Sequence, residues 1–210
     1  MQIEKMDPVG RDRVRLTLDS GESIVLYKGE LRLLKIREDG VLSDETYLKI
    51  VKGILPKRAK LRAMNLLKAR SYTEYQLRKK LLEGGYPENI VDEALSYVKS
   101  FGYVNDREFA RSYITQQSKG KSRRELFQKL QQKGIAKETL DAVFSECYGD
   151  NTGVMADETF DEKSVIIKAL RKRGFTGHET YEEKQKILAY FYRRGFEMDK
   201  VYAAMEEYLT

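Results

Sequence analysis

The chain has 210 residues with a formal net charge of +6, and 41% of its residues are hydrophobic while 34% are charged. It has no run of about 18 apolar residues, which argues against a membrane span, and its polar N-terminus does not resemble a secretory signal. The single cysteine excludes an internal disulfide and, with only one histidine, argues against a zinc site. The composition therefore indicates a cytoplasmic protein.

The first 55 residues are predicted to form a β-hairpin and short helices. Apolar residues alternate over 13–18, a turn follows at 19–21, and a second apolar run covers 23–27. A three-residue loop with Gly21 at positive φ would pair Leu16 with Ile24.

Further elements are expected on either side of this hairpin. The same loop would also pair Val14 with Leu26, and residues 3–6 are a candidate third strand. Short helices are expected at 30–36 and from Ser43 or Asp44 to about Ile54.

From Pro56 onward the apolar spacing predicts helices. Capping-box pairs mark the starts and glycines mark the ends, with Thr73 and Gln76 as one example. Pro87 is expected at a first helical position. Nine helices in three groups are expected: 57–70, 74–83 and 88–101; 106–118, 123–133 and 137–147; 161–173, 181–194 and 198–209.

The three groups read as an internal repeat. When Gly85, Gly134 and Gly195 are aligned, six apolar positions coincide in all three groups. These positions are Leu77/Leu126/Ile187, Leu81/Leu130/Phe191, Tyr86/Ile135/Phe196, Val91/Leu140/Val201, Ala94/Val143/Ala204 and Leu95/Phe144/Met205. The prediction is a mainly α protein in which three tandem three-helix repeats form an elongated modular arm, preceded by a small N-terminal β-hairpin plus helices.

The expected organisation has five parts: residues 1–55, repeat 1 at 56–102, repeat 2 at 103–149, a linker at 150–160 and repeat 3 at 161–210. The positive charge lies in the middle, where residues 56–150 hold nineteen basic and twelve acidic residues. A localised basic surface is typical of a polyanion partner, although a solvated helix face is the simpler alternative.

Candidate binding residues are the cations placed to form one stripe across the first two repeats. They are Lys57, Arg58, Lys68, Arg78, Lys79, Lys80, Lys119, Lys121, Arg123, Arg124, Lys129 and Lys133. Such a stripe suits a phosphate backbone with little sequence preference, and no aromatic single-strand platform is evident. The free N–H groups of the helix that starts after Ser122 are a further candidate for holding a phosphate.

The sequence offers little for catalysis. His178 lies in a polar loop, and Cys147 falls on the apolar stripe of its helix, so it reads as a buried small hydrophobe. The segment 120–122, Gly-Lys-Ser, ends like a phosphate-binding loop, but Thr115 stands where the first glycine is needed and a helix precedes it. We therefore expect a protein without catalytic residues, metal or cofactor.

Several strings resemble the RecX family, the regulators of the RecA recombinase. GYVNDREFARSY at 102–113 is similar to its central motif, as are KGKSRRE at 119–125 and LQQKGI at 130–135. SYTEYQLRKKL at 71–81 is similar to its first repeat and RRGF at 193–196 to its third, so the resemblance covers about 56–210. It departs from the family pattern at Asn105, at Ser122 and in the long linker.

This resemblance implies three tandem three-helix repeats, no catalysis and no cofactor. It also implies binding along the RecA filament on single-stranded DNA, with modulation, usually inhibition, of recombinase and coprotease activity. From the charge we expect weak, sequence-independent binding of single- and double-stranded DNA by a monomer. The alternative is a helix-turn-helix-like regulator that acts on DNA directly.

Overall fold

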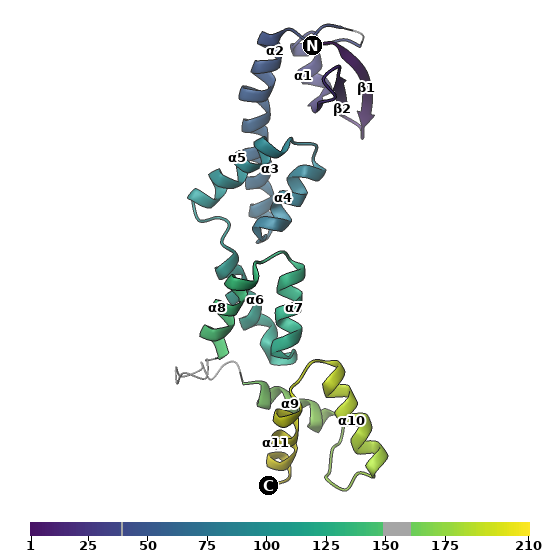
Figure 1. Ribbon diagram of the computed structural model, residues 1–210, viewed down its shortest axis with the longest axis vertical. Helices are drawn as coiled ribbons and strands as arrows, with labels where there is room; N and C mark the ends of the chain where they lie inside the picture. Colours follow the sequence, from purple (N-terminus) through teal and green to yellow (C-terminus); the bar gives the residue numbers. More distant parts are fainter. Residues whose placement is uncertain (39, 149–160) are drawn as a thin grey trace. The chain divides into compact units, whose positions relative to one another are not determined.

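The computed structural model describes residues 1–38, 40–148 and 161–210, so the expected linker at 150–160 lies outside the described residues. The chain divides into two compact units, Met1–Asn105 and Asp106–Thr210 (Figure 1). Within the described ranges, no helix is both long and apolar enough to cross a bilayer.

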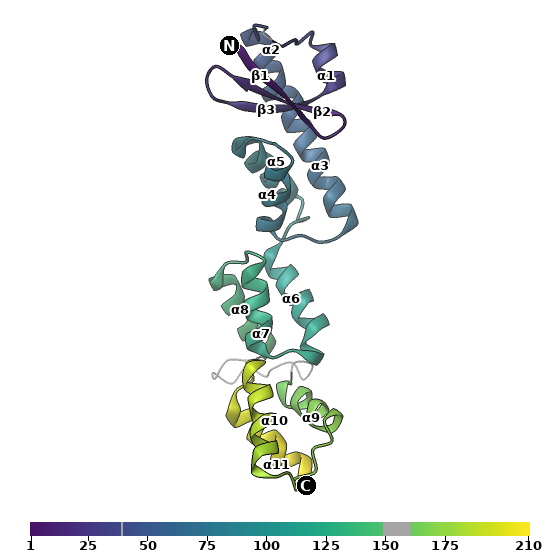
Figure 2. The same ribbon diagram turned by 90° about the vertical axis from the view of Figure 1, so that its right-hand side faces the viewer.

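The first unit begins with a three-stranded antiparallel sheet (Figure 2). Strand β1 (Ile3–Val9) pairs with β2 (Arg13–Leu18), which pairs with β3 (Ser23–Tyr27). The expected register is confirmed, because Leu16 lies opposite Ile24 and Val14 lies opposite Leu26. The expected third strand is present and extends three residues beyond Met6. Gly21 has φ +80°, as the hairpin loop requires.

The helices that follow the sheet differ from expectation in two respects: the helix expected at 30–36 begins two residues and ends three residues earlier, and the next helix does not end near Ile54. Helix α1 (Lys28–Leu33) is followed by α2 (Asp44–Lys49), whose start is capped by the Ser43 side chain. The prediction that this helix ends near Ile54 was wrong, since a π-helical segment (Ile50–Ile54) leads directly into α3 (Leu55–Ala69). The N–H of Leu55 donates to the carbonyl of Ile50, and this wider turn carries the helix past Pro56, which has no N–H to donate.

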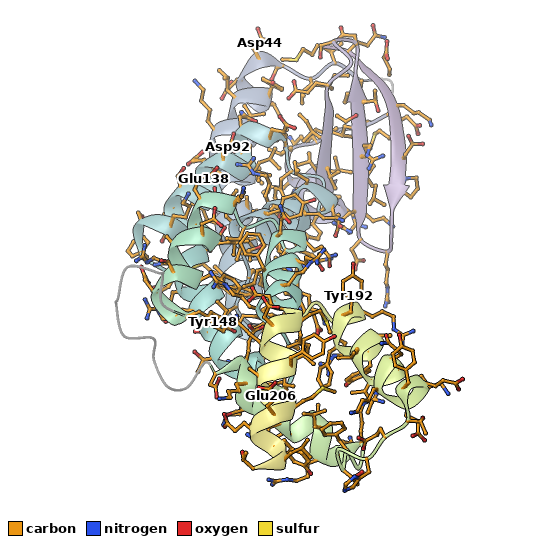
Figure 3. The ribbon with its side chains drawn as sticks, turned by 60° about the horizontal axis from the view of Figure 1, so that its bottom comes forward. Asp44, Asp92, Glu138, Tyr148, Tyr192 and Glu206 are labelled. Atoms are coloured by element: carbon orange, nitrogen blue, oxygen red, sulfur yellow. The ribbon has the colours of Figure 1, made fainter. Side chains whose placement is uncertain are left out.

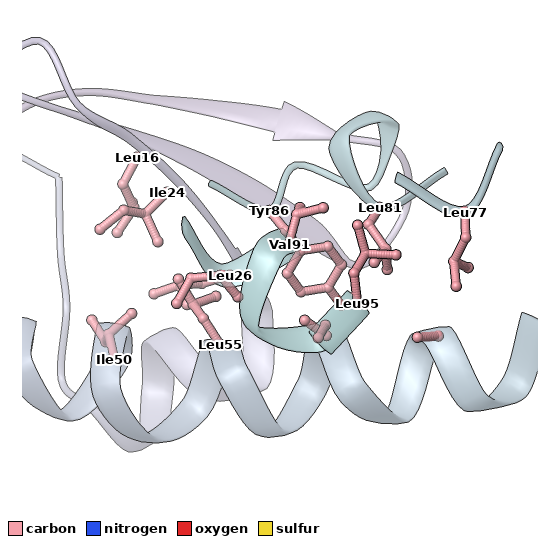
Figure 4. Packing of buried hydrophobic residues seen from close by; sticks show 14 of the residues in the cluster. Leu16, Ile24, Leu26, Ile50, Leu55, Leu77, Leu81, Tyr86, Val91 and Leu95 are labelled. Carbon is pink, nitrogen blue, oxygen red and sulfur yellow. The ribbon is translucent and has the colours of Figure 1, made fainter. Parts of the chain in front are cut away.

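One hydrophobic core joins the sheet to the first repeat. Helices α4 (Glu74–Glu83) and α5 (Glu88–Ser100) complete that repeat. Figure 4 shows Leu16, Ile24 and Leu26 of the sheet facing Ile50 and Leu55 of the helical segment. Tyr86, Val91 and Leu95 of the repeat belong to the same buried cluster, so residues 1–55 and the first repeat share their apolar packing.

The second unit holds two further three-helix groups. The first comprises α6 (Asp106–Gln117), α7 (Arg123–Gln132) and α8 (Lys137–Tyr148), with a 3₁₀ turn at Ser118–Gly120. The second comprises α9 (Glu162–Lys172), α10 (Tyr181–Arg193) and α11 (Met198–Leu209). Each group encloses its own buried apolar cluster.

The local signals explain these helix ends. The side chains of Thr73, Ser122 and Thr180 each accept the N–H of the residue three positions later, as expected of N-caps. At the other end, Gly85, Gly134 and Gly195 have φ of +84°, +84° and +77°. Pro87 is one residue earlier than expected: it is the N-cap of α5 and precedes the helix.

The repeat alignment is reproduced by burial. Every aligned apolar position is buried, except that Ile187 is half-buried. The fold class is therefore confirmed as mainly α, with three three-helix repeats behind a small N-terminal sheet.

Candidate partner-binding surface

The candidate cations on α3 do not share one environment. Lys57 and Lys68 are exposed, and no described carboxylate lies within ion-pair distance of either. The prediction that Arg58 belongs to the stripe of binding cations was wrong, since only 14% of its side chain is exposed.

Arg58 is bound inside the first unit. Its guanidinium donates to the Glu30 carboxylate at 2.7 Å and to the carbonyl of Val25 at 2.5 Å. It also lies over the rings of Tyr27 and Tyr86, at 4.9 and 5.3 Å from their centroids. These contacts tie α3 to α1 and β3, so Arg58 stabilises the fold and is not available to a partner.

The cations of α4 are partly neutralised by neighbouring acids. Arg78 pairs with Asp92 at 2.5 Å, and Lys80 pairs with Glu83 at 2.8 Å. The hydrogen bond from Lys80 lowers the pKa of Glu83, so this exposed carboxylate is fully ionised at neutral pH. Lys79 is exposed and has no carboxylate within ion-pair distance among the described residues.

In the second unit, three candidate lysines gather near one aromatic ring. The ammonium groups of Lys121 and Lys133 lie 5.6 and 5.4 Å from the ring centroid of Tyr113. Lys129 pairs with Glu125 at 3.0 Å. Burial and then repulsion from Lys129 lower the pKa of Lys121, which indicates that the two ammonium groups are close together.

The remaining candidates flank this cluster. Lys119, in the 3₁₀ turn, is exposed, and Arg124 is exposed on α7. The Arg123 guanidinium lies over the ring of Tyr148, 5.5 Å from its centroid. The candidate cations therefore form one group in each unit. Those that the structure leaves both exposed and without a carboxylate partner are Lys57, Lys68, Lys79, Lys119 and Arg124.

The prediction that backbone N–H groups at the start of α7 bind a phosphate is wrong for Arg123 and Glu125, because both N–H groups already have an acceptor within the protein. The N–H of Arg123 donates to the Glu162 carboxylate at 2.6 Å, and the N–H of Glu125 donates to the Ser122 hydroxyl oxygen at 3.1 Å. The acceptors of this helix start are thus supplied by the protein itself.

The described residues hold no group of three or more His, Cys, Asp or Glu side chains arranged for a metal ion. His178 is exposed and Cys147 is buried, as expected. An aromatic cluster that the sequence reading missed lies at the end of α5, where Phe101 contacts Tyr97 and Tyr103 with centroids 5.0 and 5.7 Å apart. All three rings are exposed.

The three helix groups also match known proteins. Residues 59–97, 105–143 and 161–205 match the family models of the first, second and third three-helix domains of RecX. The chain belongs to the RecX family. RecX relatives include the regulatory protein RecX of Caldanaerobacter subterraneus subsp. tengcongensis, with 33% identity over 117 residues, which are 55% of this chain and 59% of that protein.

Other RecX proteins are similar over different lengths. The regulatory protein RecX of Cronobacter sakazakii is 30% identical over 137 residues, which cover 54% of this chain and 82% of that protein. The matched region spans only 59% of the Caldanaerobacter protein and 56% of the regulatory protein RecX of Haemophilus influenzae.

Two solved RecX structures share the fold. A crystal structure of a regulatory protein RecX has a TM-score of 0.59 at 20% identity and covers 98% of both chains. That of RecX from Lactobacillus salivarius has a TM-score of 0.57 at 19% identity and covers 73% of this chain and 96% of that one.

The second and third RecX modules are joined by polar contacts that no sequence motif announced. The Ser122 hydroxyl donates to the carbonyl of Arg194 at 2.6 Å, and the Arg194 guanidinium donates to the carbonyl of Gly120. Glu162, only 8% exposed, accepts the Arg123 N–H and pairs with Lys200 at 3.0 Å. We call these contacts the polar joint.

Proposed function

We propose that this RecX-family chain regulates the RecA recombinase by binding RecA and lying along the RecA–single-stranded DNA filament, where it inhibits recombination and coprotease activity. Membership of the RecX family carries the proposal, because three modules matching the three RecX domains stand in order along the chain. The protein would act in the cytoplasm as a monomer, without catalysis or cofactor, in DNA repair and the SOS response.

Unpaired cations support a partner with a polyanionic surface. Lys57, Lys68 and Lys79 in the first unit and Lys119 in the second are exposed, and no described carboxylate neutralises them. Cations of this kind set the encounter rate and register of a complex more than its intrinsic affinity. They would favour a filament that presents both acidic protein surface and phosphates, and they would bind single- and double-stranded DNA weakly without reading bases.

A charge-reversal experiment tests this surface. Lys57, Lys68, Lys79 and Lys119 are replaced together by glutamate; all four are exposed, so their replacement is expected to leave the fold unchanged. Inhibition of RecA strand exchange is expected to weaken about tenfold or more, because each reversal turns attraction into repulsion. Retained helical content in circular dichroism checks the fold.

The matched control reverses four exposed cations of the third repeat, Lys168, Arg171, Lys184 and Lys186. We expect a smaller effect there, since residues 151–210 hold ten basic and eleven acidic residues. Equal effects of the two sets, or intact inhibition with the first set, would place the binding surface elsewhere. An action on one DNA sequence without RecA would instead favour a helix-turn-helix-like regulator.

A further inference from the structure

Two hollows of similar make-up lie at equivalent places in two repeats. The first has a volume of ≈ 380 Å³ and lies beside the C-terminal end of α4, at Glu83 and Gly84. The second has a volume of ≈ 530 Å³ and lies beside the C-terminal end of α10, at Arg193 and Arg194. Aligning Gly85 with Gly195 superposes Glu83 on Arg193, so the two hollows occupy the same position on the repeat.

Each hollow receives cations from the repeat and from the part of its unit that precedes it. In the first, Arg13 comes from β2, Arg62 from α3 and Lys80 from α4. In the second, Arg124 comes from α7, and the adjacent Arg193 and Arg194 come from the end of α10. The same assembly therefore arises from different elements, a strand in one unit and a helix in the other.

Two arginines in each hollow have no acidic partner. No described carboxylate lies within ion-pair distance of Arg13 or Arg62, although Arg13 donates to the carbonyl of Gly84 at 3.3 Å. Arg124 and Arg193 likewise lack an ion pair with any carboxylate that the structure describes. The acids that line the hollows are already occupied, since Glu83 pairs with Lys80 at 2.8 Å and Glu125 pairs with Lys129 at 3.0 Å.

The positive charge of the unpaired arginines exceeds the partial negative charge at the helix ends. The C-terminus of a helix carries about half a negative charge, which by itself would repel an anion. The two unpaired guanidinium groups in each hollow outweigh that half charge. A guanidinium group offers paired N–H donors that fit phosphate oxygens, and arginine is the side chain favoured for binding phosphate in this way.

Each hollow also carries a tyrosine with an accessible ring. Tyr27 is 42% exposed, and the Arg58 guanidinium lies 4.9 Å from its centroid. Tyr192 is 68% exposed and projects from the surface of α10 (Figure 3). An exposed ring next to a phosphate site is the arrangement on which unpaired bases stack.

We propose that each of these two hollows binds a phosphodiester of single-stranded nucleic acid between its unpaired arginines and stacks the adjoining base on Tyr27 or Tyr192. An acidic protein segment also fits the arginines, but a flat base stacks on an exposed tyrosine ring over an area that an aspartate or glutamate side chain does not offer, so the rings favour the nucleic acid. The inference deepens the proposed function by assigning strand contacts to the RecX fold, and it places Arg13, Arg62, Arg193, Tyr27 and Tyr192 in them.

The test uses the full chain without RecA, so its outcome is independent of any effect on the recombinase. The probes are a fluorescent oligothymidylate of about 16 nucleotides, an abasic phosphodiester of the same length and a polyglutamate competitor. Arg62→Ala and Arg193→Ala are expected to weaken binding of both phosphodiesters about threefold to tenfold each. Tyr192→Ala is expected to weaken oligothymidylate binding about fivefold or more and to leave the abasic probe unchanged.

Arg171→Ala and Tyr202→Ala are the matched controls, because both residues are exposed and lie outside the hollows. The arginine and Tyr192 variants leave the buried clusters intact, and a thermal melt checks their folding. Tyr27→Ala removes a ring that contacts Arg58, so Arg62→Ala carries the test of the first hollow. Unchanged binding in Arg62→Ala and Arg193→Ala would overturn the proposal. So would polyglutamate competing as strongly as oligothymidylate with no effect of Tyr192→Ala, which would identify an acidic protein segment as the ligand.

Discussion

At Gly85, the turn after α4 packs against Val25 of β3, and at Gly195 the equivalent turn after α10 packs against the side chain of Arg124. The first contact is apolar and belongs to a unit in which the sheet and the repeat share one buried cluster. The second accompanies the polar joint, and the second and third repeats keep separate clusters. The same turn thus supports two kinds of attachment.

The difference indicates which attachment opens more easily. In the first unit the sheet and the repeat are held together by apolar surface removed from water, which is the dominant favourable contribution to folding. In the polar joint, by contrast, each hydrogen bond replaces one that water would make, so its net contribution is only about 0.5–1.5 kcal/mol, or about 1.5–3 kcal/mol where one partner is charged. We therefore expect the sheet and first repeat to unfold together and the polar joint to open first.

Gly85→Ala is expected to have the largest effect, a loss of about 2–4 kcal/mol in the free energy of unfolding of the first unit. An added Cβ would lie 2.5 Å from Cγ2 and 3.0 Å from Cβ of Val25, and Gly85 has φ +84°. Val25 is buried and β-branched, so it cannot turn away. Urea unfolding measures the loss.

A double-mutant cycle with Val25→Ala isolates the contact. The double variant should recover about 1 kcal/mol relative to the sum of the single losses, because the smaller side chain relieves the overlap. Additivity within about 0.5 kcal/mol would mean that the close contact contributes nothing.

Glu162→Gln probes the polar joint and is expected to weaken it by about 1–2 kcal/mol. Glutamine still accepts the Arg123 N–H but no longer offers a charge to Lys200. The amide proton of Arg123 should therefore exchange about tenfold faster, while exchange in β3 stays unchanged. Glu197→Gln is the matched control: it removes the other carboxylate paired with Lys200, but that carboxylate is exposed and should contribute little. If Glu162→Gln and Glu197→Gln had equal effects, burial of the Glu162 carboxylate would not strengthen its contacts in the polar joint.

Gly195→Ala is expected to have a smaller effect than Gly85→Ala, about 1–2 kcal/mol in the second unit. Its φ is +77°, and an added Cβ would lie 3.2 Å from Cβ and Cδ and 3.3 Å from Cγ of Arg124, where a shift of a few tenths of an ångström relieves the contact. Gly102→Ala gives the backbone cost alone, because Gly102 has φ +71° and no described atom lies within 4 Å of its added Cβ. Thermal melts should place the two variants within about 0.5 kcal/mol of each other. A loss as large as that of Gly85→Ala would show that Arg124 is as rigid as Val25.

The elements most accurately predicted from the sequence are those fixed by neighbouring residues. The caps at Thr73, Ser122 and Thr180 act on N–H groups three residues away, and the loop at Gly21 sets the register of its own hairpin. Such signals depend on no distant part of the chain, so they can be read directly. The ends of the nine repeat helices were accordingly predicted to within about two residues, a typical uncertainty of helix assignment.

The candidate site was predicted less completely because pairing depends on distant residues. Arg58 is a surface residue on a helical wheel of α3, but Glu30 and the carbonyl of Val25, 28 and 33 residues earlier, bind it in the interior. Glu162 reads as an ordinary acid in the first turn of its helix, yet its partners belong to α7 and α11. Exposure of Lys57, Lys68 and Lys79 was correctly expected, while their contacts with a partner stay a prediction.

The hydrogen bond from Arg13 to Gly84 spans 71 residues, and this separation matters while the chain is being made. A ribosome that adds about 5–20 residues per second needs ~4–14 s to pass from the one residue to the other. During that interval the three strands of the sheet are completed, but Val25 still lacks the turn that covers it. The second unit has no comparable delay within each repeat, since its buried clusters form from consecutive helices. The N-terminal sheet is therefore the part of the nascent chain that most needs protection from contacts with other chains, for example by a chaperone, until the first repeat is complete.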